Sequence, residues 1–435
     1  MGEKIKVDIQ DLRIGMYVVE LDRPWLETPF PFQGFYLNSA RAIEAVRQVC
    51  EYVFVDCQPR VRRGQSAAVG DVPAAAAPVG AARDPVPIGI SPDVLARLSL
   101  GHSGTPVYRD RTTFQQEIPR ACKLRAEGRA LITQVFRDVR LGRSLEPGDA
   151  KALVRGLVES ILDNPDALVW LTQLKSRDEY TSLHCLNVSI LTLAYGRQLG
   201  LSKEALYEVG LGALLHDIGK MRVPLEILNK PGRLNPEEFA VVKTHAGAGH
   251  EILRVHSGLP DSVLDVVYGH HERRDGSGYP RNLRGDQIGL YSRMVAIVDV
   301  YDAVTSDRVY HDAASPVETL KWMYESREKL FDPWLMEQFI QCVGIFPVGS
   351  VVEMTTGEVG VVVSDNHLRR LRPRVLMVLD PDKARREAPQ VVDLMERRRD
   401  GAGRPFDVRL VLVPGAYGIH PQDYLTPERV AAGGS

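Results

Sequence analysis

The stretch HHERRDGSGYP, residues 270–280, places two adjacent histidines directly before a loop rich in aspartate, glycine and proline. Gly276 and Gly278 permit a positive φ and a close approach of the backbone to a ligand, and Pro280 fixes the exit of the loop. Tyr279 adds a flat ring with a hydroxyl group at its tip. The stretch therefore predicts a ligand-binding loop beside a pair of histidines.

Further candidate metal ligands lie on both sides of this stretch. The motif HDIGK occupies residues 216–220, and the run MVAIVDVYDA, residues 294–303, carries an aspartate in otherwise apolar surroundings. An unpaired carboxylate buried in such a run would be very costly, and binding of a metal ion removes that cost. Imidazole and carboxylate together suit a divalent transition metal. The candidate ligands are His184, His216, Asp217, His245, His270, His271 and Asp299.

The size of this donor set predicts the number of ions. Two six-coordinate ions offer about twelve positions. If Asp217 bridges both ions, the candidate side chains fill about eight positions, and roughly four remain for a hydroxide and two phosphoryl oxygens. The set therefore predicts an open, hydrolytic centre with two divalent ions of iron, manganese, nickel or zinc.

The HDIGK motif predicts how one helix could serve both ions. A helix over residues 211–220 would place His216 and Lys220 on one face, because they are four residues apart, with Asp217 turned toward the second ion. Lys220 would then reach a phosphate oxygen, although a lysine at a helix end also complements the helix dipole. Asp302, nearly one turn after the aspartate of the apolar run, is expected to orient a ligand histidine through its other ring nitrogen.

In order and spacing, these motifs resemble those of the HD-GYP family, a branch of the HD phosphohydrolases. The resemblance covers residues 184–310 and includes HD followed by GK, then HHExxDGxGYP, then DxYDA. It implies hydrolysis of the bacterial messenger cyclic di-GMP to linear pGpG at a centre of two or three metal ions, with GMP as an open alternative for the product. The residues expected to carry catalysis are His216, Asp217 and Lys220.

The resemblance also implies contacts with the substrate. Arg308, nine residues after Asp299, matches a family position associated with the substrate phosphate. His311 matches another, where arginine or lysine is more usual, and a neutral imidazole is a weaker phosphate anchor at pH 7. The predicted substrate-binding residues are Lys220, Asp275, Gly276, Gly278, Tyr279, Pro280, Arg308 and His311.

Two alternatives to this function stay open. The first is a non-catalytic receptor for cyclic dinucleotides, or a scaffold that binds the GGDEF domain of a diguanylate cyclase through the Tyr279 loop, and the complete ligand set argues against it. The second is a hydrolase of another cyclic dinucleotide, which the sequence does not exclude. A homodimer is also an open alternative.

Length and composition bound the class of protein. At 435 residues the chain is too long for one ordinary core. Its net charge is −2, so the chain lacks the excess of positive charge that binding of duplex nucleic acid requires. The five cysteines are scattered without CxxC spacing, which indicates a reducing compartment. No segment approaches eighteen uninterrupted apolar residues, so we expect a cytoplasmic protein without a membrane span.

The hydrophobic patterns predict a multidomain protein. Residues 1–60 form a small α+β module, which resembles the domain of unassigned function often found ahead of HD-GYP domains. Residues 61–112 are rich in alanine, proline and glycine and form a linker. Residues 113–345 form the all-α, HD-type helical bundle that carries catalysis. Residues 346–435 form a small β-rich domain.

The sequence also predicts where several helices and strands begin or end. A capping side chain followed by proline predicts helices that start at Pro236, Pro316 and Pro333. In the C-terminal part, short apolar runs predict strands, with a hairpin turn at residues 355–358. The predicted strands are residues 351–354, 359–363, 375–379 and 408–412.

Overall fold

The computed structural model describes most of the chain outside its Ala/Pro-rich segment. The described residues are 4–13, 16–22, 35–37, 40–56, 108–143, 147–173, 180–230, 232, 234–255, 258–306, 314–364, 372–397, 399–412 and 415–424. The chain divides into two compact units, one of residues 1–81 with 230–239 and one of residues 82–229 with 240–435.

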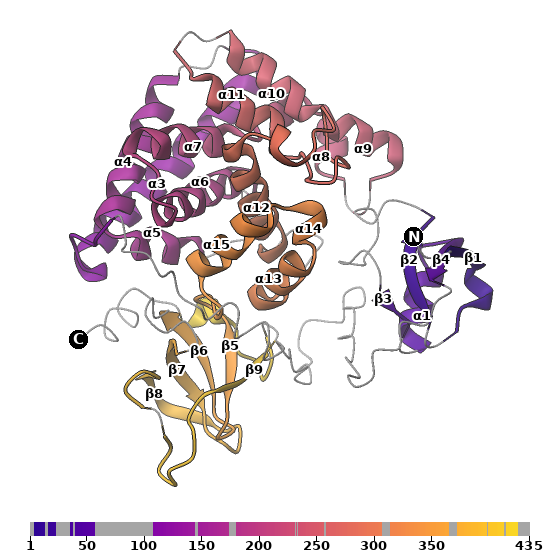
Figure 1. The fold of residues 1–435 in the computed structure, drawn as a ribbon. Coiled ribbons are helices and arrows are strands. Elements are labelled where there is room, and N and C mark those ends of the chain that lie inside the picture. The colour runs from indigo at the N-terminus through magenta and orange to yellow at the C-terminus, as the bar shows by residue number, and fades with distance from the viewer. Residues whose placement is uncertain are drawn as a thin grey trace. The chain divides into compact units, whose positions relative to one another are not determined.

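The N-terminal part is a small antiparallel sheet with one α-helix (Figure 1). Its elements are β1 (Lys4–Asp8), the 3-10 helix η1 (Ile9–Asp11), β2 (Tyr17–Leu21), β3 (Phe35–Tyr36), α1 (Ala40–Arg47) and β4 (Tyr52–Asp56), with strand order β1-β4-β2-β3. Val18 and Val53 of the sheet pack with Val46 of α1 in one apolar core. The predicted α+β character is confirmed here. Of the predicted linker, residues 61–112, only residues 108–112 are described.

Helices make up the described chain between residues 114 and 343. They are α3 (Phe114–Arg140), α4 (Pro147–Asp163), α5 (Pro165–Thr172), α6 (Tyr180–Gln198), α7 (Lys203–Leu215), η3 (Ile218–Arg222), α8 (Leu225–Leu228), α9 (Pro236–Lys243), α10 (His245–Arg254), α11 (Asp261–Gly269), η4 (Gly285–Gln287), α12 (Leu290–Thr305), α13 (Pro316–Glu325), α14 (Arg327–Leu330) and α15 (Pro333–Val343). The predicted starts of α9, α13 and α15 are confirmed. Before α15, the Asp332 carboxylate accepts a hydrogen bond from the Leu335 N–H at 3.0 Å.

Helix α6 is the centre of this helical part. It contacts α3, α4, α5, α7, α12 and α15, and every residue from 182 to 196 is buried. A helix buried on all sides belongs to the interior of a protein. Leu186 joins one large core cluster and Val188 joins the other. Helix α6 therefore separates two cores and gives His184, near its N-terminal end, a fixed frame.

The helix predicted over residues 211–220 is interrupted. Helix α7 ends before His216, and the chain then continues as the 3-10 helix η3. In 3-10 geometry, residues three apart lie on the same edge. Lys220 consequently lies over Asp217, with its Nζ atom 2.5 Å from Asp217 Oδ2. The prediction that His216 and Lys220 share one helical face is wrong for this reason.

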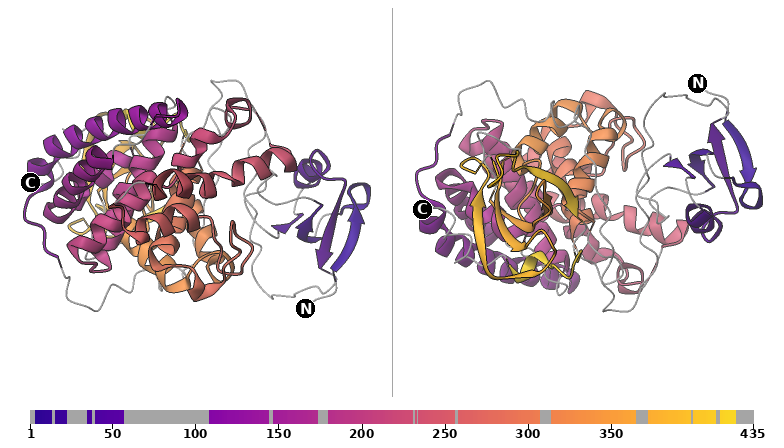
Figure 2. Two further views of the ribbon diagram at one scale, coloured as in Figure 1. Left: turned by 90° about the horizontal axis from the view of Figure 1, so that it is seen from above. Right: turned by 90° about the horizontal axis from the view of Figure 1, so that it is seen from below.

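The C-terminal part is a five-stranded antiparallel sheet, which Figure 2 shows in yellow. Its elements are β5 (Val351–Met354), β6 (Val359–Ser364), β7 (Arg374–Leu379), β8 (Arg385–Asp393), β9 (Val408–Leu412) and the 3-10 helix η5 (Pro421–Asp423), with strand order β8-β7-β6-β5-β9. Neighbouring residues of β5 face different cores, because Val351 joins the first cluster and Val352 the second. Both clusters thus extend from the helices into the sheet.

Strand β8 is the strand that the sequence did not predict. It lies at an edge of the sheet, pairs with β7 alone among the described strands, and is largely exposed. It carries Arg385, Arg386 and Pro389, so it lacks the apolar run that marked the other strands. Edge strands tolerate charge and proline, which central strands do not.

No helix among the described residues is both long enough and apolar enough to cross a membrane.

Candidate metal centre

The structure brings all seven candidate ligands together from five separate segments. His184 lies on α6, His216 and Asp217 lie between α7 and η3, His245 begins α10, His270 and His271 follow α11, and Asp299 lies on α12. All are buried except His271, whose side chain is 17% exposed. They form two donor groups, each with its ligand atoms within 4.8 Å of one another. The His245 group contains Asp217, His245, His270 and His271, and the His184 group contains His184, His216 and Asp299.

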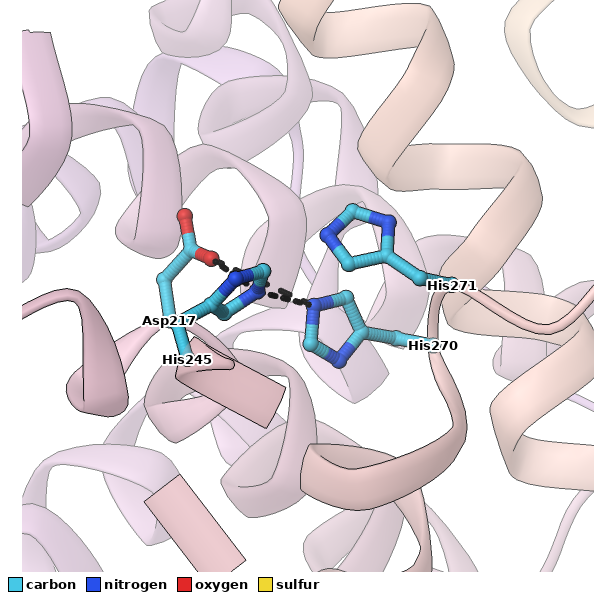
Figure 3. Close-up of side chains that lie close together, drawn as sticks. All are labelled: Asp217, His245, His270 and His271. Atoms are coloured by element: carbon cyan, nitrogen blue, oxygen red, sulfur yellow. Dashed lines mark hydrogen bonds and ion pairs between the residues drawn. The ribbon is translucent and has the colours of Figure 1, made fainter. Parts of the chain in front are cut away.

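In the His245 group, the histidine rings and the carboxylate of Asp217 point toward one another (Figure 3). The Nε2 atoms of His245 and His270 lie 3.3 Å apart. Asp217 Oδ1 is 3.5 Å from the first and 4.0 Å from the second. His271 reaches toward the other group, with Nδ1 3.8 Å from Asp299 Oδ2.

The main chain fixes which nitrogen of each ring can bind a cation. The Nδ1 atom of His245 lies 2.7 Å from the Val242 carbonyl oxygen, and that of His270 lies 3.0 Å from the Val267 carbonyl oxygen. A carbonyl oxygen can only accept, so both Nδ1 atoms carry a proton. Burial lowers the pKa of His245 to about 4 and that of His270 to about 3. Both rings are therefore neutral at pH 7, and their Nε2 atoms face each other as two lone pairs.

The His184 group is built with carboxylates instead. His184 Nε2 lies 3.0 Å from Asp299 Oδ1, and His184 Nδ1 lies 2.8 Å from Asp302 Oδ2. Burial by itself lowers the pKa of His184, but the hydrogen bonds to both aspartates outweigh it and raise the pKa to about 9. The expected role of Asp302 in orienting a ligand histidine is thus met at His184. Asn187, one turn further along α6, donates to Asp302 Oδ1 at 3.3 Å and holds that carboxylate in turn.

Asp217 connects the two groups, because its two oxygens face different histidines. Oδ1 faces His245, whereas Oδ2 lies 3.4 Å from His216 Nε2 and 4.0 Å from His184 Nε2. Burial by itself would raise the pKa of Asp217, but the Lys220 ammonium group holds it well below its ordinary value. The carboxylate is therefore ionised and available to both groups.

This donor set fits divalent metal ions. His216 Nδ1 donates to the Ala213 carbonyl oxygen at 2.7 Å, so the neutral form of the His216 ring offers Nε2 as its acceptor. His216 Nε2 and Asp217 Oδ1 are buried and form no hydrogen bond. Buried acceptors without a donor are costly unless a cation lies among them. Neutral imidazole and carboxylate are ligands that divalent transition metals accept. These two groups are therefore where this chain could hold metal ions.

Gly219, for which the sequence suggested no role, sets the distance between η3 and α10. A Cβ atom at this position would lie 1.9 Å from the His245 carbonyl oxygen and 2.4 Å from the Gly249 nitrogen. Any other residue would push His245 away from Asp217. Its place inside the HDIGK motif was the signal that pointed to it.

Glu272, a second residue without a predicted role, fastens the loop of residues 270–280. Its carboxylate is buried and accepts from the N–H of Arg281 at 2.8 Å and from the N–H of Leu283 at 3.0 Å. The Tyr279 ring consequently lies over His271, with 4.7 Å between the ring centroids. Burial raises the pKa of Tyr279, so its phenol stays neutral.

The glycines of this loop have different roles. Gly276 adopts a φ of 79°, as expected. Gly278 does not show a positive φ, and its close approach is to the loop itself, because a Cβ atom there would lie 2.3 Å from the Arg273 nitrogen. Gly278 therefore does not use the positive φ that glycine permits. Pro280 follows a cis peptide bond and is exposed.

The remaining predicted substrate contacts divide into two kinds. The Asp275 carboxylate accepts from the N–H of Ser277 at 2.9 Å and from its hydroxyl at 2.6 Å, so it is engaged inside the loop. Lys220 stays beside Asp217, and although burial lowers its pKa, Asp217 and Asp299 raise it above the ordinary value. The predicted contacts Arg308 and His311 lie outside the described residues. Substrate binding by all these residues stays a prediction.

Cys185 is a further residue at this centre that the motifs did not indicate. It follows His184 on α6 and is fully buried. Burial and the nearby Asp217 raise the pKa of its thiol well above the ordinary value. Its only signal in the sequence was its position beside a candidate ligand.

Comparisons with known proteins agree with this geometry. A family model described as an HD domain matches residues 157–335, and one described as a domain of unknown function (DUF3391) matches residues 4–150. A cyclic di-GMP phosphodiesterase of Pseudomonas aeruginosa is 38% identical over 394 residues, which are 89% of this chain and 88% of that protein.

Two further relatives match over shorter stretches. A cyclic di-GMP phosphodiesterase response regulator of Xanthomonas campestris is 38% identical over 39% of this chain and 45% of its own length. A 3'3'-cGAMP-specific phosphodiesterase of Vibrio cholerae is 37% identical over 36% of each chain. Together with the donor groups around Asp217 and the loop of Tyr279, these matches show that the chain belongs to the HD-GYP family of HD-domain proteins.

Proposed function

We propose that the protein is a metal-dependent phosphodiesterase that hydrolyses cyclic di-GMP to linear pGpG. The observation that carries this proposal is the pair of donor groups that share Asp217 and have Lys220 beside them. Paired metal sites of this kind are typical of enzymes that cleave phosphate esters. The relative that matches almost the whole chain is named a cyclic di-GMP phosphodiesterase, and this supports the choice of substrate.

Two ions are proposed, one for each donor group. The His245 group would hold one through its Nε2 atoms, and the His184 group would hold the other, with Asp217 shared between them. When bound, such ions neutralise charge on the phosphoryl group and make a water molecule more acidic for attack. Iron, manganese, nickel and zinc all suit these donors.

The chain's own residues would position the substrate. The Lys220 ammonium group is 22% exposed, remains charged and lies at the edge of the shared carboxylate. It would attract the phosphodiester anion toward the centre. The Tyr279 ring covers His271 and would bound the space beside the ions, while Glu272 holds that loop in place. Arg308 and His311 are proposed as further phosphate contacts, on the family resemblance alone.

A second candidate substrate is 3'3'-cGAMP. The relative from Vibrio cholerae that is named specific for this dinucleotide is about as similar in its matching region as the cyclic di-GMP enzymes are. The two substrates differ in one base, and metal ions at the donor groups would act on the phosphodiester that both substrates share. Conversion of pGpG to GMP, binding to GGDEF domains and a homodimer stay predictions.

The test is a substrate panel. Full-length protein, purified without oxygen and loaded with Mn²⁺ or Fe²⁺, is incubated with cyclic di-GMP, 3'3'-cGAMP and cyclic di-AMP, and products are separated by chromatography. We expect pGpG from cyclic di-GMP at the highest kcat/KM. The control is His250→Ala, which removes a histidine of α10 that stacks on Tyr268 away from the donor groups. A faster reaction with 3'3'-cGAMP would replace the proposed substrate, and binding without hydrolysis in the metal-loaded protein would refute the enzyme.

A further inference from the structure

Cys185 adds a third, sulfur-containing donor group to the centre. Its Sγ atom, a ring nitrogen of His216 and a carboxylate oxygen of Asp217 all lie within 4.8 Å of one another. All three side chains are buried, with exposed fractions of 0%, 0% and 1%. The hydrolytic function proposed above makes no use of this thiol.

The two partners of Cys185 are themselves open to a cation. His216 Nε2 is an acceptor because Nδ1 donates to the Ala213 carbonyl oxygen, and it forms no hydrogen bond. Asp217 Oδ1 is also buried without a hydrogen bond. His216 Nε2 lies 3.4 Å from Asp217 Oδ2, the oxygen that also contacts Lys220 and that an ion would have to share with it. In a tetrahedral site with bonds of about 2.0–2.1 Å, neighbouring nitrogen and oxygen ligands are separated by roughly 3.3 Å. The spacing therefore suits a small tetrahedral ion.

Ligand type determines which ions would use this third group. Imidazole and carboxylate accept a broad range of divalent ions, whereas thiolate sulfur favours soft ions over manganese or magnesium. Zinc and similar d10 ions accept sulfur, nitrogen and oxygen ligands alike. The His184 group, which lacks sulfur, has no such preference.

We propose that Cys185, His216 and Asp217 bind a thiophilic d10 divalent cation, for which Cd²⁺ is the probe, and that this binding inhibits the enzyme. A sulfur–metal bond forms, the S–H bond breaks, and the proton passes to solvent without any change of oxidation state. His216 Nε2 can bind one ion at a time, so the thiophilic ion excludes an ion from the His184 group. The inhibition rests on the proposed hydrolytic function, whereas the binding does not.

The experiment therefore measures binding separately from activity. Full-length protein freed of metal is titrated with CdCl₂, and the ultraviolet thiolate-to-cadmium charge-transfer band is recorded. We expect a band that saturates near one equivalent in the wild type and is lost in both Cys185→Ser and Cys185→Ala. The matched control is Cys122→Ser, which removes an exposed thiol and should keep the band. Circular dichroism of each variant checks the fold.

Inhibition is then measured in Mn²⁺-loaded protein, with each variant compared with its own uninhibited rate. We expect the Cd²⁺ concentration for half inhibition to rise at least tenfold in Cys185→Ser and to stay unchanged in Cys122→Ser. A wild type without the band, or a band that persists in folded Cys185 variants, would overturn the proposal while leaving hydrolysis intact. Absence of hydrolysis with the band present would overturn the proposed function and leave the cation site standing.

Discussion

His184 of the His184 group is oriented by different partners from those that orient His245 and His270 of the His245 group. In the His245 group, His245 and His270 donate to the main-chain carbonyls of Val242 and Val267, each three residues earlier in the chain. In the His184 group, His184 instead contacts the carboxylates of Asp299 and Asp302. Carbonyls leave an imidazole neutral, whereas carboxylates favour its protonated form. One group thus offers neutral nitrogen donors, and the other holds a proton that a metal ion has to replace.

The difference shows how one centre can hold two unequal sites. An ion at the His245 group meets donors that are ready at any pH above about 5, because the histidine pKa values are about 4 and 3. An ion at the His184 group competes with a proton whose pKa is about 9. Asp217 belongs to both groups, so a substitution of this residue should affect metal binding at both sites.

Asp217→Ala should have the largest effect, since it removes a ligand from both groups at once. We expect metal content to fall at both sites and kcat/KM to drop about a thousandfold, because metal ions supply several kcal/mol of transition-state stabilisation. Helical circular dichroism should change little. The measurements are metal analysis and hydrolysis rates, with the exposed Asp286→Ala as control. Full turnover at full metal content would show that Asp217 is not a shared ligand.

A change of pH should have the second-largest effect, because it should change the metal affinity of the two groups differently. Binding of an ion at the His184 group displaces the His184 proton, so its affinity should rise about tenfold per pH unit up to pH 9, about a hundredfold from pH 7. The affinity of the His245 group should stay flat down to about pH 5. Calorimetric titration at pH 7 in buffers of different ionisation enthalpy should detect one released proton for one site and none for the other. Equal proton release at both sites would contradict the comparison.

Asp302→Asn should weaken the His184 group alone. The substitution keeps the shape of the side chain but removes the charge that orients His184 through Nδ1. Measured above pH 9, where no proton competes at His184 in the wild type, the loss of such a partner should cost about 10- to 100-fold in metal affinity. The pKa of His184, followed by NMR in metal-free protein, should fall from about 9 toward its ordinary value. Asp286→Asn, at an exposed position, is the control. An equal loss of metal affinity at the His245 group would show that Asp302 does not act on the His184 group alone.

Glu272→Gln should have the smallest effect, because it leaves every donor in place. The amide of glutamine cannot accept from both the Arg281 and the Leu283 N–H as the carboxylate does. One loop hydrogen bond is then lost, at a cost of about 1–3 kcal/mol. We expect KM to rise roughly tenfold at unchanged metal content. The exposed Glu387→Gln on β8 serves as control. A loss of bound metal would mean that the loop supports the donor groups as well as the substrate.

The features that could be predicted from the sequence are those that local residues determine. Proline after a capping side chain gave the starts of α9, α13 and α15, and apolar runs gave four of the five C-terminal strands. Histidine and aspartate in known spacing identified the donors that the structure brings together. Each of these signals lies within a few residues of the feature it predicts.

The features that could not be predicted depend on partners distant in the chain. The 3-10 turn of η3 packs against α10, and only the structure shows that Gly219 leaves no room for a side chain there. Glu272 accepts from N–H groups nine and eleven residues away, which no period in the sequence indicates. Strand β8 is held by its neighbour β7 and not by burial of its own residues.

The two cores that run from the helices into the C-terminal sheet have a consequence for unfolding. Val351 and Val352 join different cores, and each core also contains residues of α6, so the sheet and the bundle share their interior. Because they share their interior, we expect the helices that contribute to these cores and the C-terminal sheet to unfold in a single cooperative transition. A chain truncated after Pro347 keeps every donor of the metal centre. It would nevertheless expose Phe339 and Ile340, so we expect it to unfold at a lower temperature than the full-length chain.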